Sequence, residues 1–172
     1  MNVLAKIDHR LSLAIHTLTR RNDFLHTTAV VFARWVFWLL LLWLMVVVFW
    51  RRGPIHVLQL AEVLIVANVF GILFNLVLGK IFVRKRPFDT HKLHPLISTH
   101  WLGGSFPSDH AMFSFAIATS LWIADPVTGA WAMLVAGLIA LSRVAVGVHY
   151  VSDVVVGTAT GILAAYVSLA LV

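Results

Sequence analysis

Three polar clusters, each at the end of a long apolar run, hold the side chains of this sequence that could do chemistry. They lie at residues 80–87, 105–110 and 142–153. Arginine and lysine beside a membrane bind phosphate oxygens, and histidine can serve as a nucleophile or as a general acid. The combination favours phosphatase chemistry.

The third cluster has the spacing of a supported nucleophile. Asp153 follows His149 by four residues, so its carboxylate can hold one ring nitrogen and leave the other free to attack. Arg143 stands six residues before His149, near the end of an apolar run. A charge is costly to keep there, so Arg143 is a functional candidate. We interpret the histidines outside the clusters as structural: His9, His16, His26, His56, His91, His94 and His100.

The first two clusters can each bind an anion. Arg86 precedes Pro87, which we expect to stop the helical run behind it and to hold the guanidinium in place. Ser108 is a natural N-cap with Asp109 in the first turn, and backbone N–H groups at such a helix start bind anions. The alternatives are an interfacial anchor of basic residues and an ordinary helix cap. His110, directly after the cap, favours the functional interpretation.

The composition places the chain in a membrane. Of its 172 residues, 60% are hydrophobic and 12% are charged, which is too apolar for an ordinary soluble domain. We therefore predict a single integral membrane domain over residues 1–172. The net charge of +6 suits anionic lipid headgroups and phosphorylated substrates, and the scatter of the basic residues argues against nucleic acid. Without cysteine there is neither a disulfide nor a thiolate metal site.

Five apolar runs can cross the roughly 30 Å hydrocarbon core as helices. They cover residues 28–50, 56–78, 108–124, 127–147 and 152–172, so the predicted fold class is all-α, a membrane helical bundle. Residues 3–18 show near-helical apolar spacing with charges between, which predicts an amphipathic helix lying in the interface rather than a cleaved signal peptide. We expect tight turns at residues 51–54 and 125–126, and one long polar loop at 79–107.

Counting the spans predicts where the clusters meet. The long loop joins spans two and three, and the turn at residues 147–152 joins spans four and five. Two crossings, spans three and four, separate these connections, so both lie on the same face of the membrane. We therefore expect Arg86, His110, Arg143 and His149 to assemble at one membrane surface.

On these residues the sequence resembles the type 2 phosphatidic acid phosphatase family over positions 80–153. That family has three motifs, which read lysine with arginine-proline, then proline-serine-glycine-histidine, then serine-arginine with histidine and aspartate. The third fits in full, from Arg143 through His149 to Asp153. In the first, Lys80 lies one residue closer to the arginine than usual, so Lys80, Arg84 or neither supplies the lysine. Asp109 replaces the glycine, which is similar to the bacterial undecaprenyl-diphosphate phosphatase branch associated with bacitracin resistance.

The resemblance implies a haloperoxidase-like helical core and a reaction without metal or cofactor. It implies that His149 attacks the terminal phosphorus and forms a phosphohistidine, that Asp153 orients the ring, and that His110 protonates the leaving group and then activates water. The implied phosphate-binding residues are Lys80, Arg86, Ser108, Asp109 and Arg143. The implied substrate is undecaprenyl diphosphate, an isoprenoid lipid, with phosphatidylglycerol phosphate, phosphatidate and a lipid A phosphate as alternatives.

Two questions stay open from the sequence. Basic residues are more numerous on the active face, so the positive-inside rule places that face in the cytoplasm, whereas the resemblance implies the outer, periplasmic face of a bacterial plasma membrane. We follow the resemblance. A membrane transporter or lipid-phosphate binder without chemistry is the alternative from another class, and the oligomeric state is not predicted. We expect Gly157, Gly161 and nearby alanines to allow close helix packing within the chain.

Overall fold

The computed structural model describes residues 3–98 and 104–172, and that part of the chain is helical with no β-strand. Most of the long helices are joined by short turns, and one long connection contains a short helix. In chain order the elements are α1 (Val3–Arg21), α2 (Asp23–Val31), the π-helical turn η1 (Phe32–Val36), α3 (Phe37–Arg52), α4 (Pro54–Ile81), α5 (Pro87–His91), α6 (Asp109–Ala124), α7 (Pro126–Ala145) and α8 (Val151–Leu171).

Local sequence signals explain where these helices begin. The side chain of Asn22 caps α2 by accepting a hydrogen bond from the backbone N–H of Leu25 at 3.0 Å. Pro54 and Pro126 occupy the first helical positions of α4 and α7, where a residue without an N–H costs nothing. Gly53 between α3 and α4 has φ 84°, a conformation that glycine adopts without strain. The two predicted tight turns are confirmed.

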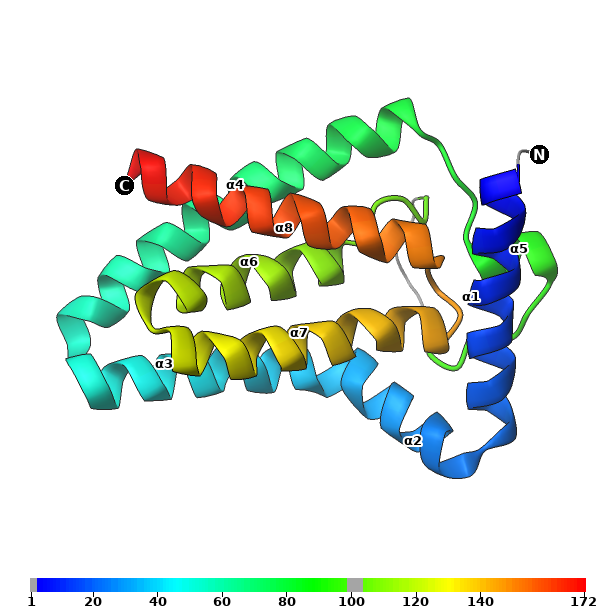
Figure 1. Ribbon diagram of the computed structural model, residues 1–172, viewed down its shortest axis with the longest axis horizontal. Helices are drawn as coiled ribbons and strands as arrows, with labels where there is room; N and C mark the ends of the chain where they lie inside the picture. Colours follow the sequence, from blue (N-terminus) through cyan, green and yellow to red (C-terminus); the bar gives the residue numbers. More distant parts are fainter. Residues whose placement is uncertain (1–2, 99–103) are drawn as a thin grey trace.

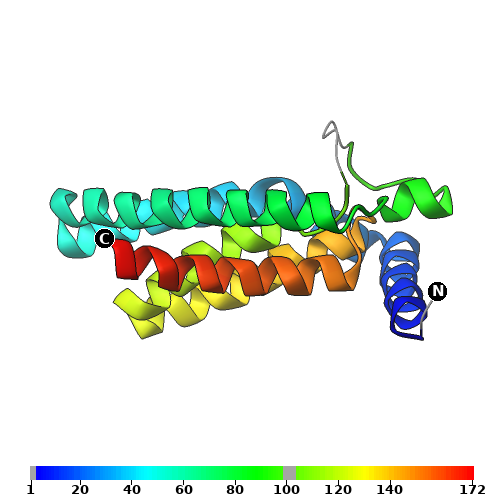
Figure 2. The same ribbon diagram turned by 90° about the horizontal axis from the view of Figure 1, so that it is seen from above.

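The long helices form two layers, with α1 across one end. Figure 1 shows α6 lying between α7 and α8, and Figure 2 shows the hairpin of α3 and α4 covering these three helices. Helix α1 runs across the end at which α7 joins α8, next to the short α5. The three clusters therefore belong to elements that converge at this end.

In the part of the chain that the structure describes, four helical segments are long and apolar enough to cross a membrane, one fewer than the five predicted: Asp23–Val47, Leu58–Ile81, Pro126–Ala145 and Val151–Leu171. The first is the predicted first span, extended by α2 and continued through η1. The predicted third span is α6, which has 16 residues and is about 24 Å long at 1.5 Å per residue. It lies between its neighbours with most of its side chains buried. The predicted fold class, a membrane helical bundle with an amphipathic N-terminal helix, is confirmed.

Close contact between α6 and α8 depends on glycine. A Cβ at Gly157 would collide with the carbonyl of Ser108, and one at Gly161 would collide with the carbonyl of Met112. These two glycines of α8 let the backbone of α6 approach it directly, and Ala164 and Ala165 are buried farther along the same helix. The small residues thus pack within the chain, as predicted, although Ala159 is exposed.

Helix α1 turns its polar side toward the protein. Ser12, His16 and Thr19 are buried, whereas the large apolar side chains on its other face are exposed: Val3, Leu4, Ile7, Leu11 and Leu18. An apolar face on the outside, at the end of a membrane bundle, fits a helix that lies in the lipid interface.

Two details of the predicted long loop are wrong. Helix α4 already ends at Ile81, so Pro87 does not stop it. Pro87 instead begins α5, with Arg86 as the residue before the helix. The reason is that proline has a preset φ and lacks the N–H that a first helical turn leaves unpaired in any case. The loop is therefore shorter than predicted and interrupted by a helix.

Candidate active site

His149 lies in the short connection between α7 and α8, and a backbone group fixes its ring. The Nδ1 atom donates a hydrogen bond to the carbonyl oxygen of Ser105 at 2.7 Å. Because a carbonyl only accepts, Nδ1 carries the proton and the lone pair of the neutral ring lies on Nε2. The side chain is almost completely buried. The lone pair of Nε2 is therefore available for nucleophilic attack.

Asp153 supports this ring from a greater distance than the sequence suggests. Its Oδ2 atom lies 3.8 Å from Nδ1 of His149, too far for a hydrogen bond, so Asp153 does not hold the ring nitrogen as predicted. Its oxygens instead accept from the backbone N–H of Tyr150 at 2.8 Å and from Nη1 of Arg84 at 2.7 Å. The carboxylate is completely buried, so its charge acts on His149 across a short distance of low polarity.

Arg143, in the last turn of α7, points into the bundle. Its Nη1 atom donates to the carbonyl oxygen of Ala33 at 2.9 Å, within the π-helical turn η1. Its Nε atom is buried and has no hydrogen-bond partner among the described residues. A buried, charged donor without a partner is costly unless an anion takes that place.

The start of α6 offers a second unpaired donor. Ser108 is the N-cap residue, as predicted, but its hydroxyl makes no capping hydrogen bond and is buried without a partner in residues 3–98 and 104–172. Asp109 follows in the first turn, where its Oδ1 accepts from Nδ2 of Asn75 at 2.9 Å. His110, the next residue, packs edge-on against the ring of Phe37 with centroids 6.1 Å apart. This helix start has the hydroxyl and the backbone N–H groups of an anion site.

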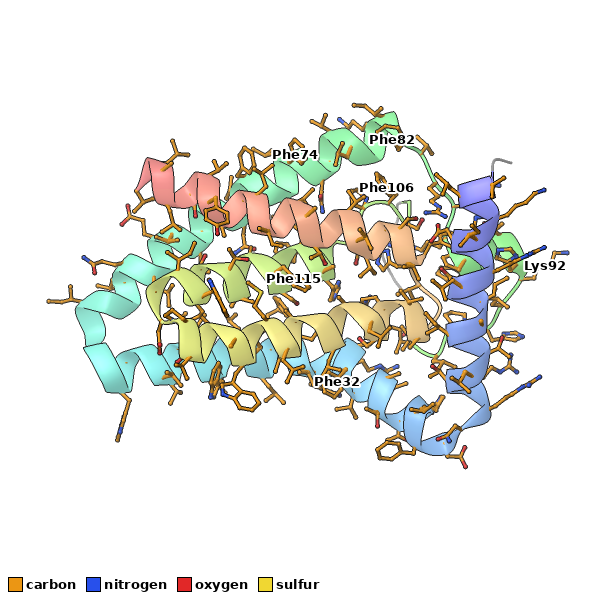
Figure 3. The ribbon with its side chains drawn as sticks, in the orientation of Figure 1. Phe32, Phe74, Phe82, Lys92, Phe106 and Phe115 are labelled. Atoms are coloured by element: carbon orange, nitrogen blue, oxygen red, sulfur yellow. The ribbon has the colours of Figure 1, made fainter. Side chains whose placement is uncertain are left out.

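The segment before α6 is held against the first cluster. The backbone N–H of Ser105 donates to the carbonyl of Arg84 at 2.8 Å, and the Ser105 hydroxyl donates to the carbonyl of Lys85. Phe106 meets Phe82 edge to face, with ring centroids 5.8 Å apart, and Figure 3 shows both rings near the end of α4. The fixed segment positions the carbonyl that orients His149.

The basic residues of the first cluster separate into different environments. Arg86 is buried, and its electrostatic neighbours include Asp109 and Asp153. Arg84 binds Asp153 directly, whereas Lys80 is exposed in the last turn of α4 and forms no hydrogen bond or ion pair with another site residue in the described part of the chain. The structure therefore brings together every predicted site residue except Lys80.

Electrostatics favour a neutral His149. Burial lowers the pKa of this imidazole from its usual 6.5, and the charges of Arg143 and Arg86 lower it further, while Asp153 acts in the opposite direction. Burial also lowers the pKa of the Arg86 guanidinium, with Asp109 and Asp153 opposing the change. His110 lies within electrostatic reach of the same two arginines and of His149. Two arginines thus lie near two histidines, and their positive charges would stabilise an anion bound between them.

Three of the other histidines, His9, His16 and His91, make packing contacts. His16 donates from Nδ1 to the carbonyl of Ala145 at 2.9 Å and lies against Gly147, which has φ 83°. His9 stacks on Tyr150 with centroids 4.7 Å apart, and His91 meets it edge-on. His100 lies outside the described residues. These contacts agree with a structural interpretation of α1 histidines.

Sequence reasoning missed Asp8 and Ser105, and assigned Arg84 only as an alternative phosphate ligand. Asp8 contacts Arg84 from α1, and Ser105 acts through its backbone. A backbone carbonyl has no residue-type signature, so no pattern could have identified Ser105. The signal for Asp8 was present, because it is a carboxylate on a helix that otherwise carries basic charges.

The fold and the site define a multi-pass membrane protein with a cationic, histidine-containing site at one end of its helical bundle. The sequence profile of the PAP2 superfamily matches residues 57–172, more than half of the chain. The protein belongs to the PAP2 superfamily and is a membrane lipid phosphatase.

Similar proteins carry related names. The chain is 28% identical over 153 residues to undecaprenyl-diphosphatase BcrC of Bacillus subtilis, covering 86% of this chain and 75% of that protein. It is 32% identical over 122 residues to the putative undecaprenyl-diphosphatase YbjG of Escherichia coli, covering 70% of this chain and 61% of that protein. The crystal structure of Aquifex aeolicus LpxE superposes with a TM-score of 0.72 at 28% identity, covering 94% and 93% of the two chains. A transmembrane PAP2-type phosphatidylglycerolphosphate phosphatase from Bacillus subtilis gives 0.71 at 25% identity, with coverage of 99% and 87%.

Proposed function

We propose that this protein removes the terminal phosphate of undecaprenyl diphosphate and so recycles a carrier lipid for cell-wall synthesis. The observation that carries the catalytic part is the fixed ring of His149, whose Nδ1 donates to the Ser105 carbonyl while two buried arginines lie nearby. The substrate part rests on similarity to BcrC and YbjG, whose names state that activity. A site at one end of a membrane bundle can receive a headgroup while the lipid chain stays in the bilayer.

In the first step, Nε2 of His149 attacks the terminal phosphorus and displaces the lipid monophosphate. A bond forms between nitrogen and phosphorus as the bridging P–O bond breaks, and His110 gives its proton to the leaving oxygen. The ring becomes cationic, which the buried carboxylate of Asp153 stabilises at 3.8 Å. In the second step, His110 takes a proton from water, which attacks the phosphohistidine and releases inorganic phosphate.

Donors around the phosphoryl group would stabilise its charge during both steps. Arg86, Arg143, the Ser108 hydroxyl and the backbone N–H of Asp109 occupy the right region. Two of these donors, Nε of Arg143 and the Ser108 hydroxyl, have no partner in the part of the chain that the structure describes. Lys80 would contribute from its exposed position at the end of α4. We propose that these groups replace the charge that a metal ion supplies in other phosphatases.

We further propose that the protein lies in a bacterial plasma membrane with this site on the outer face. The similarity to undecaprenyl-diphosphatases supports the outer face, whereas the positive-inside count of basic residues supports the cytoplasmic face. We give the similarity more weight. A second candidate substrate is phosphatidylglycerol phosphate, which is favoured by the similarity to the phosphatidylglycerolphosphate phosphatase structure.

The test is phosphate release by detergent-purified protein in excess EDTA. The lipids are undecaprenyl diphosphate, undecaprenyl phosphate, phosphatidylglycerol phosphate and phosphatidate, and the variants are His149→Ala and His94→Ala. His94 is exposed in the loop after α5, so its loss is a matched control. We expect selective release from the diphosphate, abolished only by His149→Ala. Preference for phosphatidylglycerol phosphate would favour the second candidate, and activity in His149→Ala near that of the wild type would refute the nucleophile.

A further inference from the structure

Arg84 lies between two carboxylates from opposite ends of the sequence. Its Nη2 atom binds Oδ2 of Asp8 at 2.6 Å, and its Nη1 atom binds Oδ1 of Asp153 at 2.7 Å. Nη1 also donates to the Ser152 hydroxyl at 2.6 Å. Both terminal nitrogens of the guanidinium are therefore engaged by protein oxygens, which argues against Arg84 as a phosphate ligand.

An aromatic ring fixes the plane of this guanidinium. The central carbon of Arg84 lies 3.7 Å from the ring centroid of Tyr150, the residue between His149 and α8. His9, the neighbour of Asp8 in α1, stacks on the same ring. A planar cation held by two carboxylates and an aromatic face has little freedom to reorient.

Helix α1 also caps the helix that carries Asp153. The backbone N–H of Ser152 donates to Oδ1 of Asp8 at 3.0 Å, and that of Val151 donates to the hydroxyl of Ser12 at 3.0 Å. These are the first two residues of α8, whose N–H groups have no partner inside their own helix. The caps come from a segment more than a hundred residues away, so α1 fixes the first turn of α8 in space.

We propose that Asp8 is a positioning residue of the active site, acting through Arg84 and the first turn of α8 on the carboxylate of Asp153 behind His149. The inference rests on the proposed function, because it assigns Asp8 a part in the reaction of that site. It also assigns α1 a task beyond lying in the lipid interface.

Asp8 and Asp153 share the positive charge of Arg84, and the loss of Asp8 therefore changes the charge around His149. Arg84 carries one positive charge and serves two carboxylates, so Asp153 keeps part of its negative charge for His149. In Asp8→Asn the whole charge of Arg84 falls on Asp153, and one nearby negative charge is lost. The cationic phosphohistidine is then less stabilised, so kcat falls, and His149 becomes harder to protonate.

The pH response of His149 depends on groups from every element around it. Asp153 faces it from α8, Arg143 from α7, Arg86 from the segment before α5, and His110 from α6. Asp8→Asn leaves these four in place. Any change in the titration of His149 therefore reports on the charge that Asp8 and Arg84 impose through Asp153.

The experiment compares the full-length wild type with Asp8→Asn, Asp8→Glu and Asp23→Asn. Asp23 is exposed at the start of α2, so its variant is a control for charge loss alone. We expect Asp8→Asn to lower kcat roughly tenfold, the scale on which outer hydrogen-bond partners of active-site histidines act, with a smaller change in KM. The acid limb of kcat/KM should move to lower pH. Asp8→Glu should restore the position of that limb, and Asp23→Asn should match the wild type.

A second readout does not need turnover. Protein labelled with ¹⁵N-histidine gives the titration of His149 by NMR, with the signal assigned by its loss in His149→Ala. We expect this ring to titrate at lower pH in Asp8→Asn. An unchanged titration and an unchanged acid limb would overturn the proposal, even with lower activity, because they would show that Asp8 only stabilises the fold. Absence of activity in the wild type would refute the proposed function, while the NMR comparison would still decide the role of Asp8.

Discussion

Replacing Asp153 by asparagine removes a negative charge that directly faces His149. The separation of 3.8 Å and an effective dielectric constant of about 20 give an attraction of about 4 kcal/mol between that charge and a full positive charge on the ring. Arg84 binds the same carboxylate and offsets part of this energy. We therefore expect Asp153→Asn to lower kcat about a hundredfold, which corresponds to about 3 kcal/mol of transition-state stabilisation.

The same substitution also affects folding, and the two effects must be separated. Asparagine has one accepting oxygen, whereas Asp153 accepts from both the backbone N–H of Tyr150 and Arg84. One of these donors loses its partner in a buried site, which costs about 1–3 kcal/mol of stability. Thermal unfolding in detergent, followed by the fluorescence of the seven tryptophans, measures this loss.

The assay is the initial rate of phosphate release at saturating lipid, at a temperature where both proteins are folded. Asp153→Asn with a lower Tm but with kcat within about threefold of the wild type would refute the reasoning. That result would mean that the Ser105 carbonyl alone orients His149 and that the charge of Asp153 has no part in the chemistry.

Four further outcomes are expected. Because burial and the arginines lower the pKa of His149 below 6.5, the acid limb of kcat/KM should lie below pH 6.5, and a limb at or above that value would contradict it. Since the unfolded chain takes up that proton more readily, Tm should also fall as the pH drops below 6.5. Gly157→Ala should destabilise the bundle by about 1–3 kcal/mol because the new Cβ meets the Ser108 carbonyl. Gly137→Ala in α7 places its Cβ in open space and should leave Tm unchanged or raise it, and equal Tm changes in the two variants would contradict this. Arg143→Lys should lower kcat about a hundredfold, because lysine keeps the charge but not the fork that reaches both Ala33 and a phosphoryl oxygen, and wild-type rates would contradict it.

Span counting predicted the assembly of the site because membrane crossing constrains topology strongly. Once five runs of suitable length are recognised, the connection that carries His149 must lie on the same side as the loop that carries Arg86. The contacts between Ser105 and His149 and between Arg84 and Asp153 agree with this prediction. No packing detail was needed for it.

The rotation of each helix about its axis was not predictable in the same way. Helix α6 is apolar on all sides and is surrounded by other helices, so the sequence does not indicate which face carries His110 toward the site. The π-helical turn η1, whose Ala33 carbonyl receives Arg143, also has no signature in residue type. These features depend on tertiary packing and on backbone groups.

The shortness of α6 bears on how a lipid phosphate could reach the site. A helix of 16 residues covers about 24 Å of a hydrocarbon core of roughly 30 Å. If one end of α6 lies at a membrane surface, the other end therefore stops short of the opposite surface. If the turn to α7 lies at one surface, Ser108 and His110 lie several ångströms below the other. Burial of Arg86, Arg143 and His149 agrees with such a recessed position, and α1 runs across this end of the bundle. A phosphate group reaches a site at this depth most easily when its lipid chain remains in the adjacent leaflet, which favours lipid phosphates over water-soluble ones.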